Sequence, residues 1–125
     1  MLHRSHMSRR ATVLVVDDDA DVVETMVDIL RDEGHDVRSA CNGREALALV
    51  ERERPDLVLL DLEMPVMDGR TFIAELRAAG IDDVPIVVLS GGAADAGDLG
   101  VERVSKPLRL DTLLGLIARV RGAGA

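Results

Sequence analysis

Short runs of branched apolar residues alternate along this chain with longer segments whose apolar positions recur every three or four residues. The run at residues 12–16 is continuous and is followed by acidic residues. Such a run is typical of a strand that is buried on both faces of a parallel sheet. Similar runs predict further strands at residues 36–40, 57–60, 85–89 and, more weakly, 101–105.

The segment after the first strand has the spacing of an amphipathic helix. Its apolar residues are Val22, Val23, Met26, Val27 and Leu30. Asp21 followed by Glu24 resembles a capping box, and Gly34 is a typical stop signal. We therefore expect a helix that begins near Asp21 and ends before Gly34.

Two further helices are predicted in the middle of the chain. Asn42 and Glu45 form a second cap pair, which favours a helix at residues 43–53. The segment 70–79 has helical spacing and ends at Gly80.

The last helix sets the expected end of the domain. Its apolar residues are Leu110, Leu113, Leu114, Ile117 and Val120. We expect this helix to fade at Gly122, which leaves residues 122–125 as a flexible end. Residues 1–10 have the character of a disordered tail or expression remnant, so a single domain is predicted over residues 11–121.

Alternating strands and helices predict an α/β fold, in which helices cover both faces of one parallel sheet. The connection before the fifth strand is the exception. Residues 91–100 include four glycines and one large apolar side chain, whereas a parallel crossover usually needs a dozen residues or more. We expect a loop here, or at most a turn or two of helix.

Composition narrows the possible functions. The chain of 125 residues is 47% hydrophobic but only 1% aromatic, and its formal net charge is −8. An acidic chain with so few aromatics is a poor candidate for binding nucleic acid directly. No apolar run is long enough for a membrane span, and we expect neither a membrane segment nor a secretory signal. The single cysteine, Cys41, fits a reducing cytoplasm, and we expect it to be half-buried.

The chemically useful side chains follow the predicted strands. Asp17 and Asp18 come after the first strand, Asp61 ends the third, Ser90 ends the fourth and Lys106 follows the fifth. Ligands of open parallel sheets bind beyond the carboxyl ends of the strands, so these residues should converge. Clustered carboxylates favour a hard divalent cation such as Mg²⁺, and an ammonium beside them suits a phosphoryl group.

Several nearby residues have simpler explanations. Asp19 and Asp21 are more typical of helix caps than of metal ligands. Met64 and Met67 are expected to pack, and His35 is expected to connect two elements at the surface.

Four features together resemble the receiver domain of two-component response regulators. They are the segments Val13–Asp19 and Asp61–Gly69, the strand-end Ser90, and Lys106 followed by Pro107. The resemblance covers about residues 11–121. It implies a flavodoxin-like sheet with the strand order 2-1-3-4-5.

The resemblance also implies a role for each matching residue. Asp61 would accept a phosphoryl group from a histidine kinase or a histidine phosphotransfer protein. Asp17, Asp18, Asp61 and the main-chain carbonyl of Glu63 would hold Mg²⁺, or Mn²⁺ in its place. Ser90 and Lys106 would contact the phosphoryl group.

Two departures from the family pattern concern the output. The crossover at residues 91–100 is short, and Arg103 stands where many relatives have an aromatic residue that swings inward. We therefore do not transfer the hydroxyl–aromatic switch to this chain. We also expect Glu63 and Gly91 to tune the lifetime of the phosphoryl group.

The leading interpretation is a signalling receiver that catalyses only its own phosphotransfer and dephosphorylation. It would act in the cytoplasm and signal to a downstream protein. One alternative is a pseudo-receiver that never takes phosphate. A less favoured one is a Mg²⁺-dependent aspartyl phosphatase, whose motif after the first strand differs at Asp21.

Overall fold

A computed structural model describes residues 10–90, 100–105 and 108–124 of the chain. The described residues form one parallel sheet of five strands in the order β2-β1-β3-β4-β5. The strands are β1 (Thr12–Val16), β2 (Asp36–Ala40), β3 (Leu57–Asp61), β4 (Ile86–Ser90) and β5 (Glu102–Ser105). The helices of the described residues are α2 (Ala20–Asp32), α3 (Gly43–Arg52), α4 (Gly69–Ala78) and α5 (Leu110–Gly124). The predicted fold class and strand order are confirmed.

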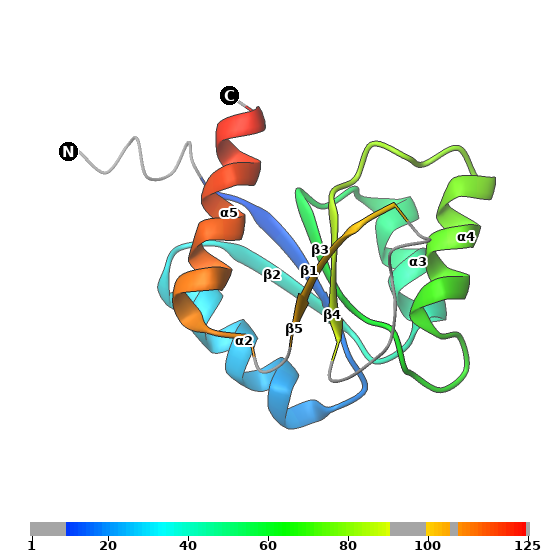
Figure 1. Cartoon of the computed structure of the whole chain (residues 1–125), viewed down its shortest axis with the longest axis horizontal. Helices are drawn as coiled ribbons and strands as arrows, with labels where there is room; N and C mark the ends of the chain where they lie inside the picture. Colours follow the sequence, from blue (N-terminus) through cyan, green and yellow to red (C-terminus); the bar gives the residue numbers. More distant parts are fainter. Residues whose placement is uncertain (1–9, 91–99, 106–107, 125) are drawn as a thin grey trace.

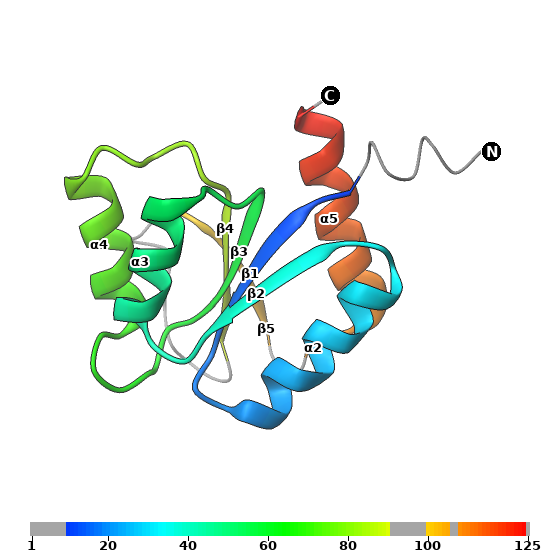
Figure 2. The same ribbon diagram turned by 180° about the vertical axis from the view of Figure 1, so that it is seen from behind.

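The helices form two layers around the sheet, with α2 and α5 on one face and α3 and α4 on the other (Figures 1 and 2). Side chains of the central strands alternate between these layers, as the period of a strand requires. Val13 and Val15 of β1 pack toward α2 and α5, whereas Leu14 and Val16 pack toward α3 and α4. Because both faces are covered, the central strands read as continuous apolar runs.

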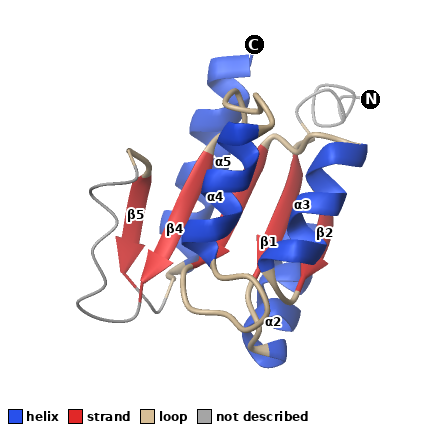
Figure 3. Cartoon of the chain, turned by 90° about the vertical axis from the view of Figure 1, so that its right-hand side faces the viewer, coloured by secondary structure: helices blue, strands red, loops and turns tan. Residues whose placement is uncertain are grey.

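The strands at the two edges of the sheet are more exposed than the strands at its centre. All residues of β3 are buried, whereas in β5 only Val104 is even half-buried. Figure 3 shows β5 at one edge of the sheet and β2 at the other. This exposure explains why the fifth strand gave only a weak pattern in the sequence.

Two predicted helix ends are wrong. Helix α2 begins at Ala20 and is capped by Asp19, so Asp21 lies inside the helix rather than at its cap. Helix α5 continues past Gly122 and ends at Gly124, beyond the predicted end of the helix. Glycine weakens a helix by about 1 kcal/mol, but it retains the N–H that continues the hydrogen-bond ladder.

The short crossover predicted at residues 91–100 lies outside the described residues except for Gly100. No helix in the described part of the chain combines the length and apolarity needed to cross a membrane.

Candidate functional site

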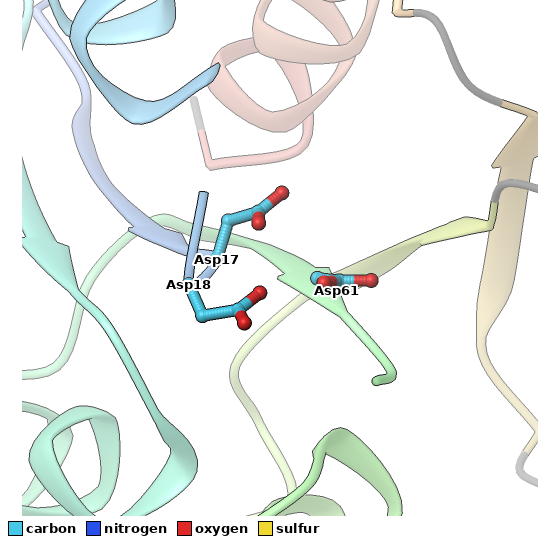
Figure 4. Close-up of side chains that lie close together, drawn as sticks. All are labelled: Asp17, Asp18 and Asp61. Atoms are coloured by element: carbon cyan, nitrogen blue, oxygen red, sulfur yellow. The ribbon is translucent and has the colours of Figure 1, made fainter. Parts of the chain in front are cut away.

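Three carboxylates meet at the carboxyl edge of the sheet. The Cα atoms of Val16 and Leu60 are partners in the β1–β3 ladder, so the residues that follow them, Asp17 and Asp61, lie side by side at the end of the two strands. Asp18 comes next in the chain. One carboxylate oxygen from each of the three aspartates lies within 4.8 Å of the others (Figure 4). The predicted convergence of these residues is therefore observed.

Burial and hydrogen bonds fix the two central carboxylates. Asp17 is 2% exposed and Asp61 is 8% exposed, while Asp18 is open to solvent. Asp17 Oδ1 accepts a hydrogen bond from the backbone N–H of Asp19 at 2.9 Å, and the Asp17 N–H donates to the carbonyl of Ala40 at 3.1 Å. Asp61 Oδ1 accepts from the N–H of Glu63 at 3.4 Å. Asp17 and Asp61 are thus buried carboxylates at the edge where ligands of open parallel sheets bind.

The loop from β3 to α4 borders this cluster. It is closed by a 2.9 Å hydrogen bond from the N–H of Gly69 to the carbonyl of Leu62. Asp68 caps α4 by accepting from the N–H of Thr71 at 2.8 Å, and this hydrogen bond lowers the pKa of the Asp68 carboxyl below its ordinary value. Asp68 therefore acts as the N-cap of α4.

The same loop contains a strained turn. The N–H of Met67 donates to the carbonyl of Pro65 at 2.7 Å across Val66. Val66 has a φ of 69°, which is unusual for a β-branched residue, and its side chain is 73% exposed. Met64 and Met67 pack against the core of the α3–α4 face, as predicted.

Comparison with known proteins assigns the family. A family model described as the response regulator receiver domain matches residues 13–118. The chain belongs to the response regulator receiver family. Its relatives include the transcriptional regulatory protein PrrA of Mycobacterium tuberculosis, which is 41% identical over 115 residues, or 87% of this chain and 48% of PrrA.

Solved receiver structures have the same fold. The chemotaxis protein CheY4 of Vibrio cholerae is 32% identical, with a TM-score of 0.78 over 89% of this chain and 98% of its own. The receiver domain of sensor histidine kinase PA1611 from Pseudomonas aeruginosa is 28% identical, with a TM-score of 0.81 over 90% of this chain and 98% of its own. That structure holds a magnesium ion in its active-site cleft. The present chain spans about half the length of PrrA.

The structure describes only some of the other site residues that are expected of a receiver. Ser90 ends β4, and its Cα is the partner of Ser105 at the end of β5. Lys106 follows Ser105 in the chain but lies outside the described residues, as do Gly91 and the side chain of Ser90. Glu63 is exposed beside Asp61. Arg103 is exposed on β5, so this position of the receiver carries no buried side chain.

Asp19 belongs to helix α2 rather than to the carboxylate cluster. Its Oδ1 accepts from the N–H groups of Asp21 at 3.0 Å and of Val22 at 3.4 Å. The prediction that Asp19 is a helix cap is confirmed.

Two predictions about single residues are wrong. Cys41 is exposed, and a hydrogen bond with the Glu45 carboxylate raises the pKa of its thiol above the ordinary value. His35 is 7% exposed, and its Nδ1 accepts a hydrogen bond from the N–H of Ala11 at 3.1 Å. Both residues lie in short connections between elements, and for His35 a contact with a distant part of the chain accompanies its burial.

Proposed function

We propose that this receiver accepts a phosphoryl group on Asp61 from the phosphohistidine of a histidine kinase or of a histidine phosphotransfer protein. The observation that carries the proposal is the cluster of Asp17, Asp18 and Asp61 at the carboxyl edge of the sheet. Membership of the receiver family supports it.

The donor set of the cluster fits Mg²⁺. This ion takes oxygen ligands at about 2.0–2.1 Å in an octahedron, so opposite ligands lie about 4.2 Å apart. The carboxylate oxygens of Asp17, Asp18 and Asp61 lie within 4.8 Å of one another, which is close to that span. We assign these three residues and the main-chain carbonyl of Glu63 as ligands. Mn²⁺ accepts the same oxygen donors.

When bound, the ion would offset the negative charge of the carboxylates and of the phosphoryl oxygens. An oxygen of the Asp61 carboxylate forms a bond to phosphorus while the phosphorus–nitrogen bond to the donor imidazole breaks. The electron pair of the broken bond goes to the imidazole nitrogen. The 8% exposure of Asp61 limits access to a donor that approaches beyond the end of β3.

We assign Ser90 and Lys106 to the oxygens of the transferred phosphoryl group. The pairing of Ser90 with Ser105 supports this, because Lys106 is the next residue of the chain. A serine hydroxyl can donate to a phosphoryl oxygen, and an ammonium offsets its charge.

The partners follow from the same proposal. The phosphodonor is a histidine kinase or phosphotransfer protein, and the phosphorylated surface acts on a downstream protein. The single cysteine supports a cytoplasmic location. Arg103 is exposed where many relatives have an aromatic residue that swings inward. This supports a signalling mechanism that does not bury a side chain at this position.

Labelling with acetyl phosphate tests the function. We expect wild type to form an acyl phosphate that requires Mg²⁺, and Asp61→Asn to form none. Asp82→Asn is the matched control, because Asp82 is an exposed aspartate before β4, at the opposite edge of the sheet. It should label as wild type does. Absence of labelling in wild type would favour a pseudo-receiver instead. Equal labelling of Asp61→Asn would exclude Asp61 as the phosphoacceptor.

A further inference from the structure

The N-terminus of α3 touches the loop that carries Glu63. Gly43 is the first residue of α3, and its N–H donates to the carbonyl of Met67 at 2.8 Å. N–H groups in the first turn of a helix have no partner within the helix, so this donor is free to hold another segment. It holds the β3–α4 loop.

The contact leaves no room for a side chain at position 43. A Cβ atom there would lie 2.7 Å from the carbonyl oxygen of Met67 and 2.8 Å from its Cγ. Gly43 is buried. Any other residue must therefore displace either the helix or the loop.

The helix is the better anchored of the two. Asn42 Oδ1 accepts from the N–H of Glu45 at 2.9 Å, and Glu45 Oε1 accepts from the N–H of Cys41 at 2.9 Å. Ala46 and Val50 fix α3 in the core with 0% exposure. In contrast, Pro65 and Val66 of the loop are exposed. A side chain at position 43 would therefore move the loop.

Movement at Met67 would reach Glu63. The loop is pinned at Leu62 by the N–H of Gly69 and at Met67 by the N–H of Gly43. Only four residues separate these two hydrogen-bonded residues, and one of the four, Pro65, has a fixed φ. Because the turn across Val66 is tight, a shift of Met67 also moves the residues between it and Leu62.

Since Asp61 and the Glu63 carbonyl are the ligands assigned to this loop, we propose that Gly43 is a positioning residue for the metal site. It touches neither metal nor phosphoryl group and acts by fixing the loop through the Met67 carbonyl. This inference rests on the proposed function, because it assumes that the Glu63 carbonyl binds the ion.

The test compares Mg²⁺ binding by Gly43→Ala and Gly115→Ala, measured by isothermal titration calorimetry. Gly115 lies within α5, and none of the described atoms is within 4 Å of a Cβ built there, so its variant controls for a glycine-to-alanine change in a helix. We expect the dissociation constant of Gly43→Ala to rise about tenfold or more, as for other residues that orient metal ligands. Gly115→Ala should bind as wild type does.

A double variant separates positioning from a loss of stability. Met67→Ala removes the Cγ atom and the Sδ atom that a Cβ at position 43 would meet. The overlap with the Met67 carbonyl oxygen at 2.7 Å remains. Gly43→Ala/Met67→Ala, relieved of the side-chain overlap alone, should fold and recover only part of the affinity that Gly43→Ala loses. If Gly43→Ala does not fold, the double variant is compared with Met67→Ala alone, and a weaker affinity in the double variant is expected.

The outcomes distinguish the inference from the proposed function. If wild type binds Mg²⁺ and Gly43→Ala binds it equally well, Gly43 has no positioning role. Equal affinities of the double variant and Met67→Ala would overturn the inference in the same way. If wild type itself binds no Mg²⁺, the metal site of the proposed function fails and the inference falls with it.

Discussion

Gly69 allows strand β3 and helix α4 to approach closely. A Cβ atom at this position would lie 2.8 Å from the carbonyl oxygen of Asp61 and 2.9 Å from Cα of Leu62. Both are backbone atoms, which cannot rotate away. The N–H of Gly69 also donates to the carbonyl of Leu62 at 2.9 Å, so a retreat of α4 would break this bond. Gly69→Ala must therefore strain the connection between β3 and α4.

The size of the effect follows from overpacking. Inserting a methyl group into a closely packed site costs about 1–3 kcal/mol. For a chain of 125 residues, an unfolding entropy of about 2.1 cal/mol/K per residue gives about 4 °C of melting temperature for each kcal/mol. Gly69→Ala should therefore lower Tm by about 4–12 °C. Gly115→Ala, in open space within α5, should instead raise Tm by about 2–4 °C.

Thermal melts followed by far-UV circular dichroism measure both variants, because the chain has no Trp or Tyr for intrinsic fluorescence. Both variants replace a helical glycine with alanine, so the difference between their Tm values does not include the general preference of helices for alanine. If Gly69→Ala melts at or above the temperature of Gly115→Ala, the close contact with β3 is wrong.

Three further predictions concern residues outside the carboxylate cluster. His35→Ala should lower the free energy of unfolding by about 1–3 kcal/mol, because the buried N–H of Ala11 loses its acceptor; urea denaturation measures this. Asp68→Ala should cost about 1 kcal/mol at neutral pH. Folding lowers the pKa of Asp68, so the stabilisation that its carboxylate provides is complete above the unfolded pKa of about 3.9 and is lost as the pH falls through the folded pKa. The free energies of unfolding of wild type and Asp68→Ala should therefore converge in acid. Cys41 should react slowly with iodoacetamide for an exposed thiol, and Glu45→Gln should accelerate the reaction.

Each of these predictions has a result that contradicts it. A His35→Ala variant as stable as wild type would show that the bond to Ala11 contributes nothing. A constant difference between wild type and Asp68→Ala down to strongly acidic pH would exclude the titration of Asp68 as its source. An unchanged alkylation rate in Glu45→Gln would remove Glu45 as the cause of the raised thiol pKa.

The sheet and its acidic edge could be predicted because their signals are local. A strand covered on both faces is apolar over its buried length, as β1 is from Val13 to Val16 and β3 from Leu57 to Leu60. Where such runs stop, the next polar residues lie at the edge of the sheet, which is how Asp17, Asp18 and Asp61 were identified. The helix cap at Asn42 was equally visible, because a cap lies within a few residues of the amide it binds.

The errors arise where two nearby residues could both cap a helix, or where a contact distant in sequence determines whether a residue is buried. Asp19 and Asp21 are both good caps, and the turn after β1 selects Asp19. His35 is buried because it meets the backbone of Ala11, 24 residues away, and no periodic pattern encodes that contact. The contact between Gly43 and Met67 likewise joins the start of α3 to the β3–α4 loop, and these segments are adjacent only in the folded protein.

The central claim is that Asp61, within its carboxylate cluster, carries the phosphoryl group. Reductive trapping tests it most directly, since borohydride converts an aspartyl phosphate to homoserine, which peptide mass spectrometry locates in the chain. After incubation with acetyl phosphate and Mg²⁺, we expect homoserine at position 61 and at no other aspartate. Trapping at Asp17, Asp18 or another aspartate, or none in a sample that binds Mg²⁺, would contradict the account.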